Sequence, residues 1–203
     1  MMIPRTATAC QFALLLFASF PSHAWDDERV IDETFVSPNG MYAIRFEGSY
    51  RGEGAYFLKT ESGESEILRR YVHYGPQLTW ISDEIAELTF GCGSPCWEGY
   101  YYDAAERQLS PEYSMPLAAS ASGRLVVSIE DDGLAVREMI SGRTLATHEM
   151  DTGAWAGLLV FCDPHFHFQS YREFRYSYSC GDATFGPYAP GNASHVIHIP
   201  SAQ

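Results

Sequence analysis

Two histidines, His165 and His167, have the spacing in this 203-residue chain that best suits a metal ion. Residues two positions apart on a β-strand face the same side, so both imidazoles could share a metal, with Asp163 close by. The competing interpretation is aromatic packing, because phenylalanine and tyrosine side chains surround the pair and such residues fill the interfaces between sheets. We favour this structural role and expect no metal and no other cofactor.

A catalytic nucleophile is equally hard to find. The sequence contains no Gly-x-Ser-x-Gly elbow. Abundant Asp and Glu leave a glycosidase-like pair of carboxylates open, but acidic residues without a distinctive context are typical of a solvated surface. We expect a protein that is not an enzyme. A hydrolase that acts on a glycan or a peptide, through carboxylates or a histidine-bound metal, is the alternative.

The first 24 residues have the layout of a secretory signal peptide. Arg5 supplies a positive start, residues 12–18 form an apolar segment, and Ala24 ends a short run of small residues. No later run approaches the ~18 apolar residues of a membrane-spanning helix. We expect residues 1–24 to be removed and residues 25–203 to form a single periplasmic domain that does not insert into a membrane.

Four cysteines would remain after export: Cys92, Cys96, Cys162 and Cys180. An even number in an oxidising compartment indicates two disulfides, for which three pairings exist. We favour the two local pairs, Cys92 with Cys96 and Cys162 with Cys180, because the second would brace two strands. A redox site is the alternative, but Cys-x3-Cys is not the Cys-x-x-Cys of thiol oxidoreductases.

The chain is strongly acidic, with 13 Lys and Arg against 26 Asp and Glu and a net charge of −13. Such a field repels nucleic acid and anionic membranes, and it attracts a basic partner. Acidic composition also serves solubility alone. We expect no nucleic acid, and another protein as the partner, a basic hydrolase or toxin.

Turn signals followed by apolar, β-branched runs recur along the chain, and helical periodicity is missing. The signals fall at Gly40, Asp83, Gly123 and Asp163, at intervals of 43, 40 and 40 residues. A period near 40 residues is typical of β-propeller blades. The sequence therefore predicts an all-β fold, a small propeller-like array of about four antiparallel sheets braced by disulfides. In closed propellers the last strand completes the first blade, so we expect residues 194–199 to pair beside the first unit.

Two segments carry a family resemblance. The run Ser37-Pro38-Asn39-Gly40-Met41-Tyr42-Ala43-Ile44-Arg45-Phe46 resembles the Ser-Pro-Asp-Gly-x-x-apolar-Ala-Phe signature of TolB-like and WD40-like propeller repeats, and residues 122–126 are a weaker copy. The resemblance implies a propeller fold but no particular activity, because propellers serve as scaffolds, inhibitors, lectins and hydrolases.

In size, signal peptide, charge and β-rich character the chain is also similar to periplasmic immunity proteins. Bacteria keep these proteins against cell-wall-degrading effectors of type VI secretion, and some of them plug an amidase active site. The likeness implies an inhibitor and carries over no residue. A structural accessory of an envelope complex, as TolB-like propellers are, is a further hypothesis.

Two polar connections could supply a loop that enters a partner's cleft. Residues 49–54 offer Tyr50 and Arg51, and residues 108–114 offer Ser110, Glu112 and Tyr113. A loop that rigid blades hold in place loses little entropy on binding, which favours affinity. The alternative is that both segments are ordinary connectors.

Overall fold

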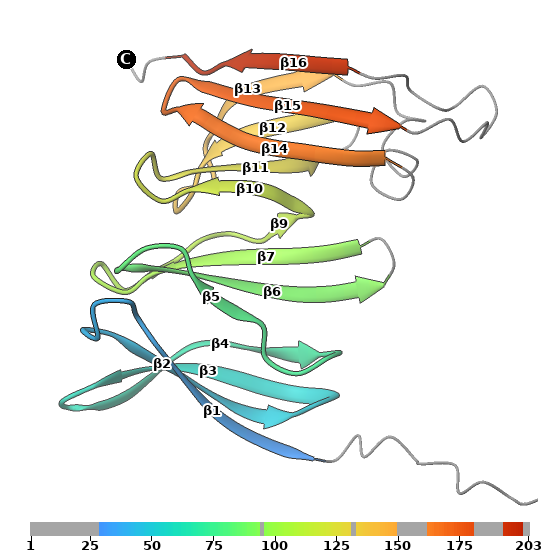
Figure 1. Ribbon diagram of the computed structural model, residues 1–203. Helices are drawn as coiled ribbons and strands as arrows, with labels where there is room; N and C mark the ends of the chain where they lie inside the picture. Colours follow the sequence, from blue (N-terminus) through green and yellow to red (C-terminus); the bar gives the residue numbers. More distant parts are fainter. Residues whose placement is uncertain (1–28, 94–95, 131–132, 150–161, 181–192, 201–203) are drawn as a thin grey trace, which may run out of the picture.

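The structure is a computed structural model that describes residues 29–93, 96–130, 133–149, 162–180 and 193–200 (Figure 1). The described residues contain strands and turns and no helix, which confirms the all-β prediction. The predicted signal peptide, residues 1–24, lies outside the described residues.

The first sheet contains four antiparallel strands in sequence order: β1 (Val30–Val36), β2 (Ala43–Ser49), β3 (Gly52–Thr60) and β4 (Gly63–Val72). The turn between β1 and β2 forms because Gly40 adopts a φ of 74°, which glycine reaches without steric cost. The Asn39 side chain accepts hydrogen bonds from the Ser37 hydroxyl and the Met41 amide, both at 2.9 Å. The Ser-Pro-Asn-Gly signature therefore acts as a self-capped turn between β1 and β2.

The second sheet contains β5 (Leu78–Trp80), β6 (Ile85–Gly93), β7 (Cys96–Asp103) and β8 (Gln108–Leu109), with β9 (Tyr113–Ser114) also paired to β7. Cys92 and Cys96 form a disulfide across the β6–β7 turn. This bond confirms the first of the two predicted pairs.

Two further sheets complete the fold. The third contains β10 (Pro116–Ser120), β11 (Leu125–Glu130), β12 (Gly133–Glu138) and β13 (Thr144–Glu149). The fourth contains β14 (Cys162–Ser170), β15 (Glu173–Cys180) and β16 (Ala193–His198). The expected array of four antiparallel sheets is therefore present.

Consecutive sheets bury their faces against each other, so the spatial order follows the chain order (Figure 1). Ile44, Phe46 and Tyr56 of the first sheet share a core with Leu88 and Phe90 of the second. A smaller core joins the second and third sheets and includes Tyr101, Tyr113, Val126 and Met139. A third core joins the third and fourth sheets and includes Val127, Val136, Phe174, Tyr176 and Ile197.

The last strand does not pair where we expected it. β16 pairs with β15 in the fourth sheet, with Ile197 opposite Phe174, and not beside the first sheet. The reason lies in its apolar side chains, because this pairing buries Ile197 and the following Ile199 in the core between the third and fourth sheets. The first sheet takes its outer strand from β1 instead. The expectation that residues 194–199 close the array onto the first unit is wrong.

The second predicted disulfide has a compatible backbone. In the β14–β15 register Cys162 stands directly opposite Cys180. We expect peptide mapping without reduction to recover one peptide pair that joins these two cysteines and another that joins Cys92 to Cys96. A peptide that links Cys92 or Cys96 to Cys162 or Cys180 would contradict the assignment. Because the Cys92–Cys96 bond closes a loop with a sequence separation of only 4, its removal should cost about 2 kcal/mol of stability.

An aromatic and histidine cluster lies between the third and fourth sheets. The Tyr176 hydroxyl and Nε2 of His148 are 3.0 Å apart, and the His195 ring stacks on Tyr176 at 4.7 Å between centroids. Burial lowers the pKa of His148 below its ordinary value of 6.5, and the neighbouring His195 lowers it further. The native cluster therefore favours neutral His148.

This shift predicts a pH dependence of stability. The unfolded chain protonates His148 near pH 6.5, whereas the folded chain does so only at lower pH, so the unfolded state binds more protons in that window. The free energy of unfolding should fall as the pH drops below about 6.5 and level off below the folded pKa. Urea titrations at several pH values measure this, and His148→Gln should flatten the dependence relative to the exposed control His198→Gln. Equal slopes in the two variants would rule out His148 as the source.

Candidate functional site

The β2–β3 connection is a hairpin tip formed by Tyr50 and Arg51 alone. β2 ends at Ser49 and β3 begins at Gly52, so the longer loop expected over residues 49–54 is a tight turn. The turn requires glycine at position 52, because its φ is 147° and a Cβ there would lie 2.3 Å from the Ser49 Oγ. The Ser49 hydroxyl donates to the Arg51 carbonyl at 3.0 Å. The glycine conformation and this hydrogen bond fix the backbone positions of Tyr50 and Arg51.

The hairpin tip is also bonded to the segment that leaves the first sheet. The Gly75 amide donates to the Tyr50 carbonyl at 2.7 Å, and the Tyr50 amide donates to the Arg29 carbonyl at 3.2 Å. Tyr50 therefore lies beside Gly75, in the connection between β4 and β5.

Three exposed tyrosines gather at this place. Tyr50 is 37% exposed, and Tyr71 and Tyr74 are each 54% exposed. The Arg51 guanidinium lies 5.7 Å from the Tyr74 ring centroid, and the His73 ring lies 5.0 Å from that of Tyr71. We call these five residues, Tyr50, Arg51, Tyr71, His73 and Tyr74, the tyrosine rim.

The second sheet supports the tyrosine rim from beside it. A Cβ at Gly91 of β6 would lie 3.3 Å from the Tyr74 ring, so glycine at this position leaves room for the ring to lie close to the backbone. Gly91 is followed at once by the disulfide hairpin of Cys92 and Cys96. Tyr74 therefore lies against the β6 backbone one residue before the Cys92–Cys96 disulfide.

The residue types of the rim are typical of protein interfaces. Tyrosine and arginine are the residues most often found at the energetic centre of protein interfaces, because they combine a large apolar surface with a hydrogen-bonding end. Tyrosine also has few rotatable bonds, so it loses little entropy on binding. Sequence analysis identified Tyr50 and Arg51 but not Tyr71, His73 and Tyr74. The signal that could have identified Tyr71 and His73 is the strand alternation before the Gly75-Pro76 turn. It places both side chains on the face opposite to buried Val72.

The second predicted segment, residues 108–114, does not present its side chains as expected. Ser110 is 5% exposed and Tyr113 is 1% exposed. The Ser110 hydroxyl accepts from the Tyr101 amide at 2.8 Å, and the Tyr113 hydroxyl donates to the carbonyls of Glu138 and Met139 at 2.9 and 2.8 Å. These hydroxyls turn inward because Ser110 lies between the short strands β8 and β9, which both pair with β7, and Tyr113 lies within β9. Ser110 and Tyr113 therefore hold the fold together and are not open to a partner.

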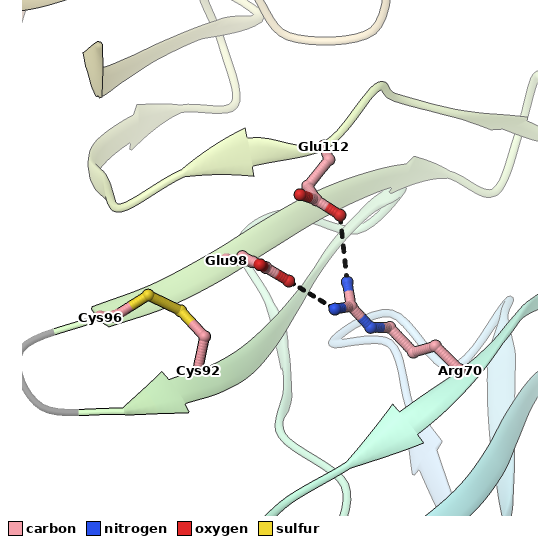
Figure 2. The surroundings of a disulfide bond; sticks show 5 residues. All are labelled: Arg70, Cys92, Cys96, Glu98 and Glu112. Atoms are coloured by element: carbon pink, nitrogen blue, oxygen red, sulfur yellow. Dashed lines mark hydrogen bonds and ion pairs between the residues drawn. A yellow bond between two sulfur atoms is a disulfide. The ribbon is translucent and has the colours of Figure 1, made fainter. Parts of the chain in front are cut away.

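Glu112, the third residue of that segment, is exposed but already engaged (Figure 2). Its carboxylate accepts from Arg70 at 3.3 Å and from the Tyr100 hydroxyl. Arg70 also pairs with Glu98 and lies 4.4 Å from the Phe90 ring centroid. Burial and the hydrogen bond to Glu112 together raise the pKa of Tyr100 to about 12, so this hydroxyl stays a donor. The network joins β4 to β7 and the segment before β9.

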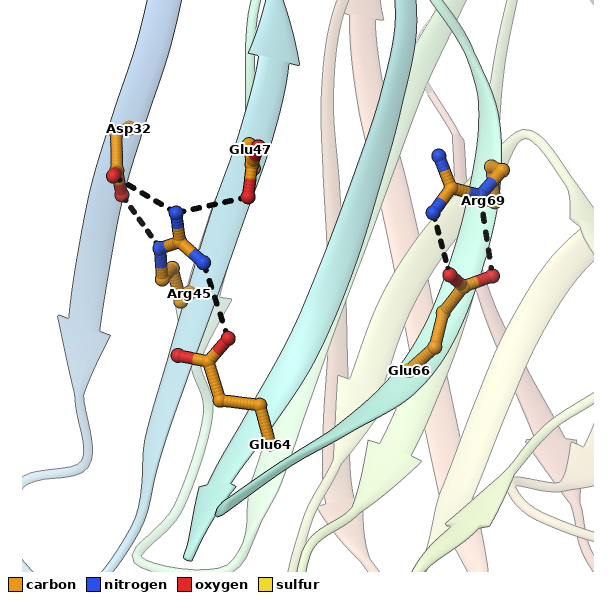
Figure 3. Close-up of polar contacts among 6 residues, drawn as sticks. All are labelled: Asp32, Arg45, Glu47, Glu64, Glu66 and Arg69. Carbon is orange, nitrogen blue, oxygen red and sulfur yellow. Dashed lines mark hydrogen bonds and ion pairs between the residues drawn. The ribbon is translucent and has the colours of Figure 1, made fainter.

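The outer face of the first sheet carries alternating charges that satisfy one another (Figure 3). Arg45 contacts Asp32 at 2.8 Å, Glu47 at 2.8 Å and Glu64 at 3.1 Å. Its hydrogen bonds to Asp32 hold the pKa of that carboxyl below the usual value. A face with such internal pairing is solvated and offers little apolar surface to a partner.

His165 and His167 lie on β14 and are both exposed, as the strand alternation required. Within the described parts of the chain, no three His, Cys, Asp or Glu side chains come together in a way that could hold a metal ion. The same residues contain no helix that is long and apolar enough to cross a membrane.

Comparison with known proteins places the fold only loosely. No family model and no curated protein sequence matches the chain. One similar solved structure is the uncharacterized protein lmo1340 from Listeria monocytogenes EGD-e, with a TM-score of 0.35 and 13% identity over 84% of this chain and 53% of that one. Another is Hsv2 from Kluyveromyces lactis, with a TM-score of 0.33 and 6% identity over 85% and 51% of the two chains. The chain thus spans about half the length of these proteins, and likeness at this level carries no functional argument.

The inward role assigned to Tyr113 is testable. Burial raises its pKa to about 12, so its hydroxyl donates at neutral pH. Tyr113→Phe removes the only hydroxyl that reaches the Glu138 and Met139 carbonyls among the described residues, and it should lower the free energy of unfolding by about 1–2 kcal/mol. Tyr171→Phe, which removes a hydroxyl from an exposed ring, is the control and should change it by less than about 0.5 kcal/mol. Equal stability of the two variants in urea would contradict the assignment.

Proposed function

We propose that this chain is an exported, periplasmic protein-binding domain that engages its partner through the tyrosine rim. The observation that carries the proposal is the grouping of three half-exposed tyrosines with Arg51 and His73 on a constrained hairpin tip. Monomeric proteins seldom expose several large aromatic rings together unless something binds there.

The constraint on the rim supports tight binding. The Tyr50 backbone is bonded on two sides, and Tyr74 rests beside the disulfide hairpin. Little conformational freedom remains for a partner to remove, so more of the contact energy contributes to affinity. Of the two segments that the sequence offered, the hairpin tip with Tyr50 and Arg51 is therefore the one we retain.

The partner that best fits the charge of the chain is a basic protein. A net charge of −13 gives an attractive long-range field for such a partner, whereas the rim itself carries apolar rings and the cation Arg51. Charge would then raise the association rate, and the tyrosines would limit dissociation. A cell-wall-degrading hydrolase whose cleft receives the hairpin tip is the specific form of this proposal, in which the domain acts as an immunity protein.

The test is a capture experiment with matched variants. Bait protein without residues 1–24 is exposed to envelope extract in wild-type form, as Tyr50→Ser/Tyr71→Ser/Tyr74→Ser, and as the control Val36→Ser/Met41→Ser/Tyr171→Ser. The control removes apolar groups elsewhere on the surface that are at least as exposed as the three rim tyrosines. We expect one partner on the wild type and the control, with affinity for the rim variant weaker by more than about a hundredfold.

Salt and partner identity provide further readouts. Binding should weaken as ionic strength rises, because the acidic field is screened. Inhibition of the captured protein's hydrolase activity would support the immunity form of the proposal. A partner that stays bound to the rim variant, or a wild-type bait that captures nothing, would refute the rim as the binding site.

A further inference from the structure

A groove crosses the ends of three sheets, at the end of β7 that is remote from the disulfide. It has a volume of about 910 Å³ and runs from Leu109 of the second sheet past the β12–β13 turn of the third to the β14–β15 turn of the fourth. Known small-molecule sites have volumes of roughly 300–1,000 Å³. The groove is therefore large enough for a ligand and is separate from the tyrosine rim.

The floor of the groove is apolar and well packed. Leu125, Met139 and Ile199 line it and are nearly fully buried, with Leu109 and Leu145 beside them. Tyr113, which the sequence offered as a binding residue, fixes this floor through its hydrogen bonds to Glu138 and Met139. Such a floor favours a hydrocarbon chain over a polar ligand.

One cation at the groove, Arg124, is held in place by a buried carboxylate. The Arg124 side chain is 48% exposed, and it pairs with Asp103, whose side chain is 0% exposed. Asp103 is itself fixed, because its carboxylate accepts from the amides of Ala105 and Glu106 at 3.0 Å. The Arg124 backbone has a φ of 50° and its carbonyl accepts from the Met139 amide at 2.7 Å. The guanidinium is thus fixed at the edge of the apolar floor.

The second cation is not compensated. Arg172 lies on the β14–β15 turn with its guanidinium 5.1 Å from the Tyr171 ring centroid, and no carboxylate of the described residues pairs with it. Glu138, the one acidic residue among the described residues of the lining, is instead paired with Arg143 and hydrogen-bonded to Ser141. The described lining therefore carries an excess positive charge in a chain that is strongly acidic.

We propose that this groove binds an anionic amphiphile, a single hydrocarbon chain with a carboxylate head. The chain lies on the Leu125, Met139 and Ile199 floor, and the carboxylate faces the arginines at the edge. An uncharged amphiphile lacks the contact with the arginines, and a short carboxylate lacks the contact with the apolar floor. Both features of the ligand are therefore needed for affinity.

The experiment uses the chain without residues 1–24 and measures displacement of dansyl-undecanoic acid by octanoate, decanoate, dodecanoate and decanol, each below its aggregation concentration. Affinity should rise by about three- to fourfold for each added methylene, as burial of hydrocarbon predicts. Decanol should bind about tenfold more weakly than decanoate, and Arg172→Ala should weaken decanoate about tenfold, in keeping with loss of a charge-assisted hydrogen bond.

Arg69→Ala is the matched control, because it makes the same change of charge on the outer face of the first sheet and should leave decanoate binding unaltered. Arg172 is exposed on a turn, so its loss should not unfold the protein, and an unchanged urea midpoint verifies this. Failure of the dansyl probe to bind would overturn the proposal. So would equal affinities for decanol and decanoate, or equal effects of Arg172→Ala and Arg69→Ala.

Discussion

The fold depends on the burial of each small sheet against the next. A sheet of three to five strands is not stable in water with both faces exposed, and it needs a neighbour to cover at least one apolar face. Here the second and third sheets are covered on both faces, whereas the first and last each share one core. Aromatic rings contribute to every one of these cores, as in the tilted contact between Phe46 and Tyr56 at 4.9 Å between centroids and the edge-to-face contact between Tyr56 and Phe90. The large area that each ring buries stabilises sheets that contain few residues each.

The end of the array poses a different problem, because the first sheet keeps one face in water and has β1 as an edge strand. An unprotected edge invites pairing with another chain. No further sheet of the described residues packs on this face, and charged side chains cover it instead. Arg45 of β2 reaches Asp32 on β1 and Glu64 on β4 (Figure 3). Exposed ion pairs contribute little to stability. Their more important effect is to keep this face polar and to oppose aggregation through it.

Local signals in the sequence predicted local structure well. The Ser37 to Gly40 turn, the strands around it and the Cys92–Cys96 bond all depend on residues close together in the chain. The errors concern choices between distant partners. The run at residues 194–199 is apolar enough to pair with several strands, and only the burial of Ile197 against Phe174 decides for the fourth sheet. The polarity of Ser110 and Tyr113 likewise predicted exposure, because their inward hydrogen-bond partners, the Tyr101 amide and the Met139 carbonyl, come from residues up to 26 positions away.

The same constraint explains why the candidate binding surfaces lie where the strands end. Side chains within the stack are committed to the cores, so surface that can vary without loss of packing remains mainly at the turns. The two candidate surfaces use opposite ends of β7: Gly91 and Trp97 pair at the end near the tyrosine rim, and Asp103, which holds Arg124 at the groove, lies at the other. Because they lie at opposite ends of the second sheet, a ligand at one surface need not displace a partner at the other. Any coupling between them would have to pass through the packed side chains of that sheet.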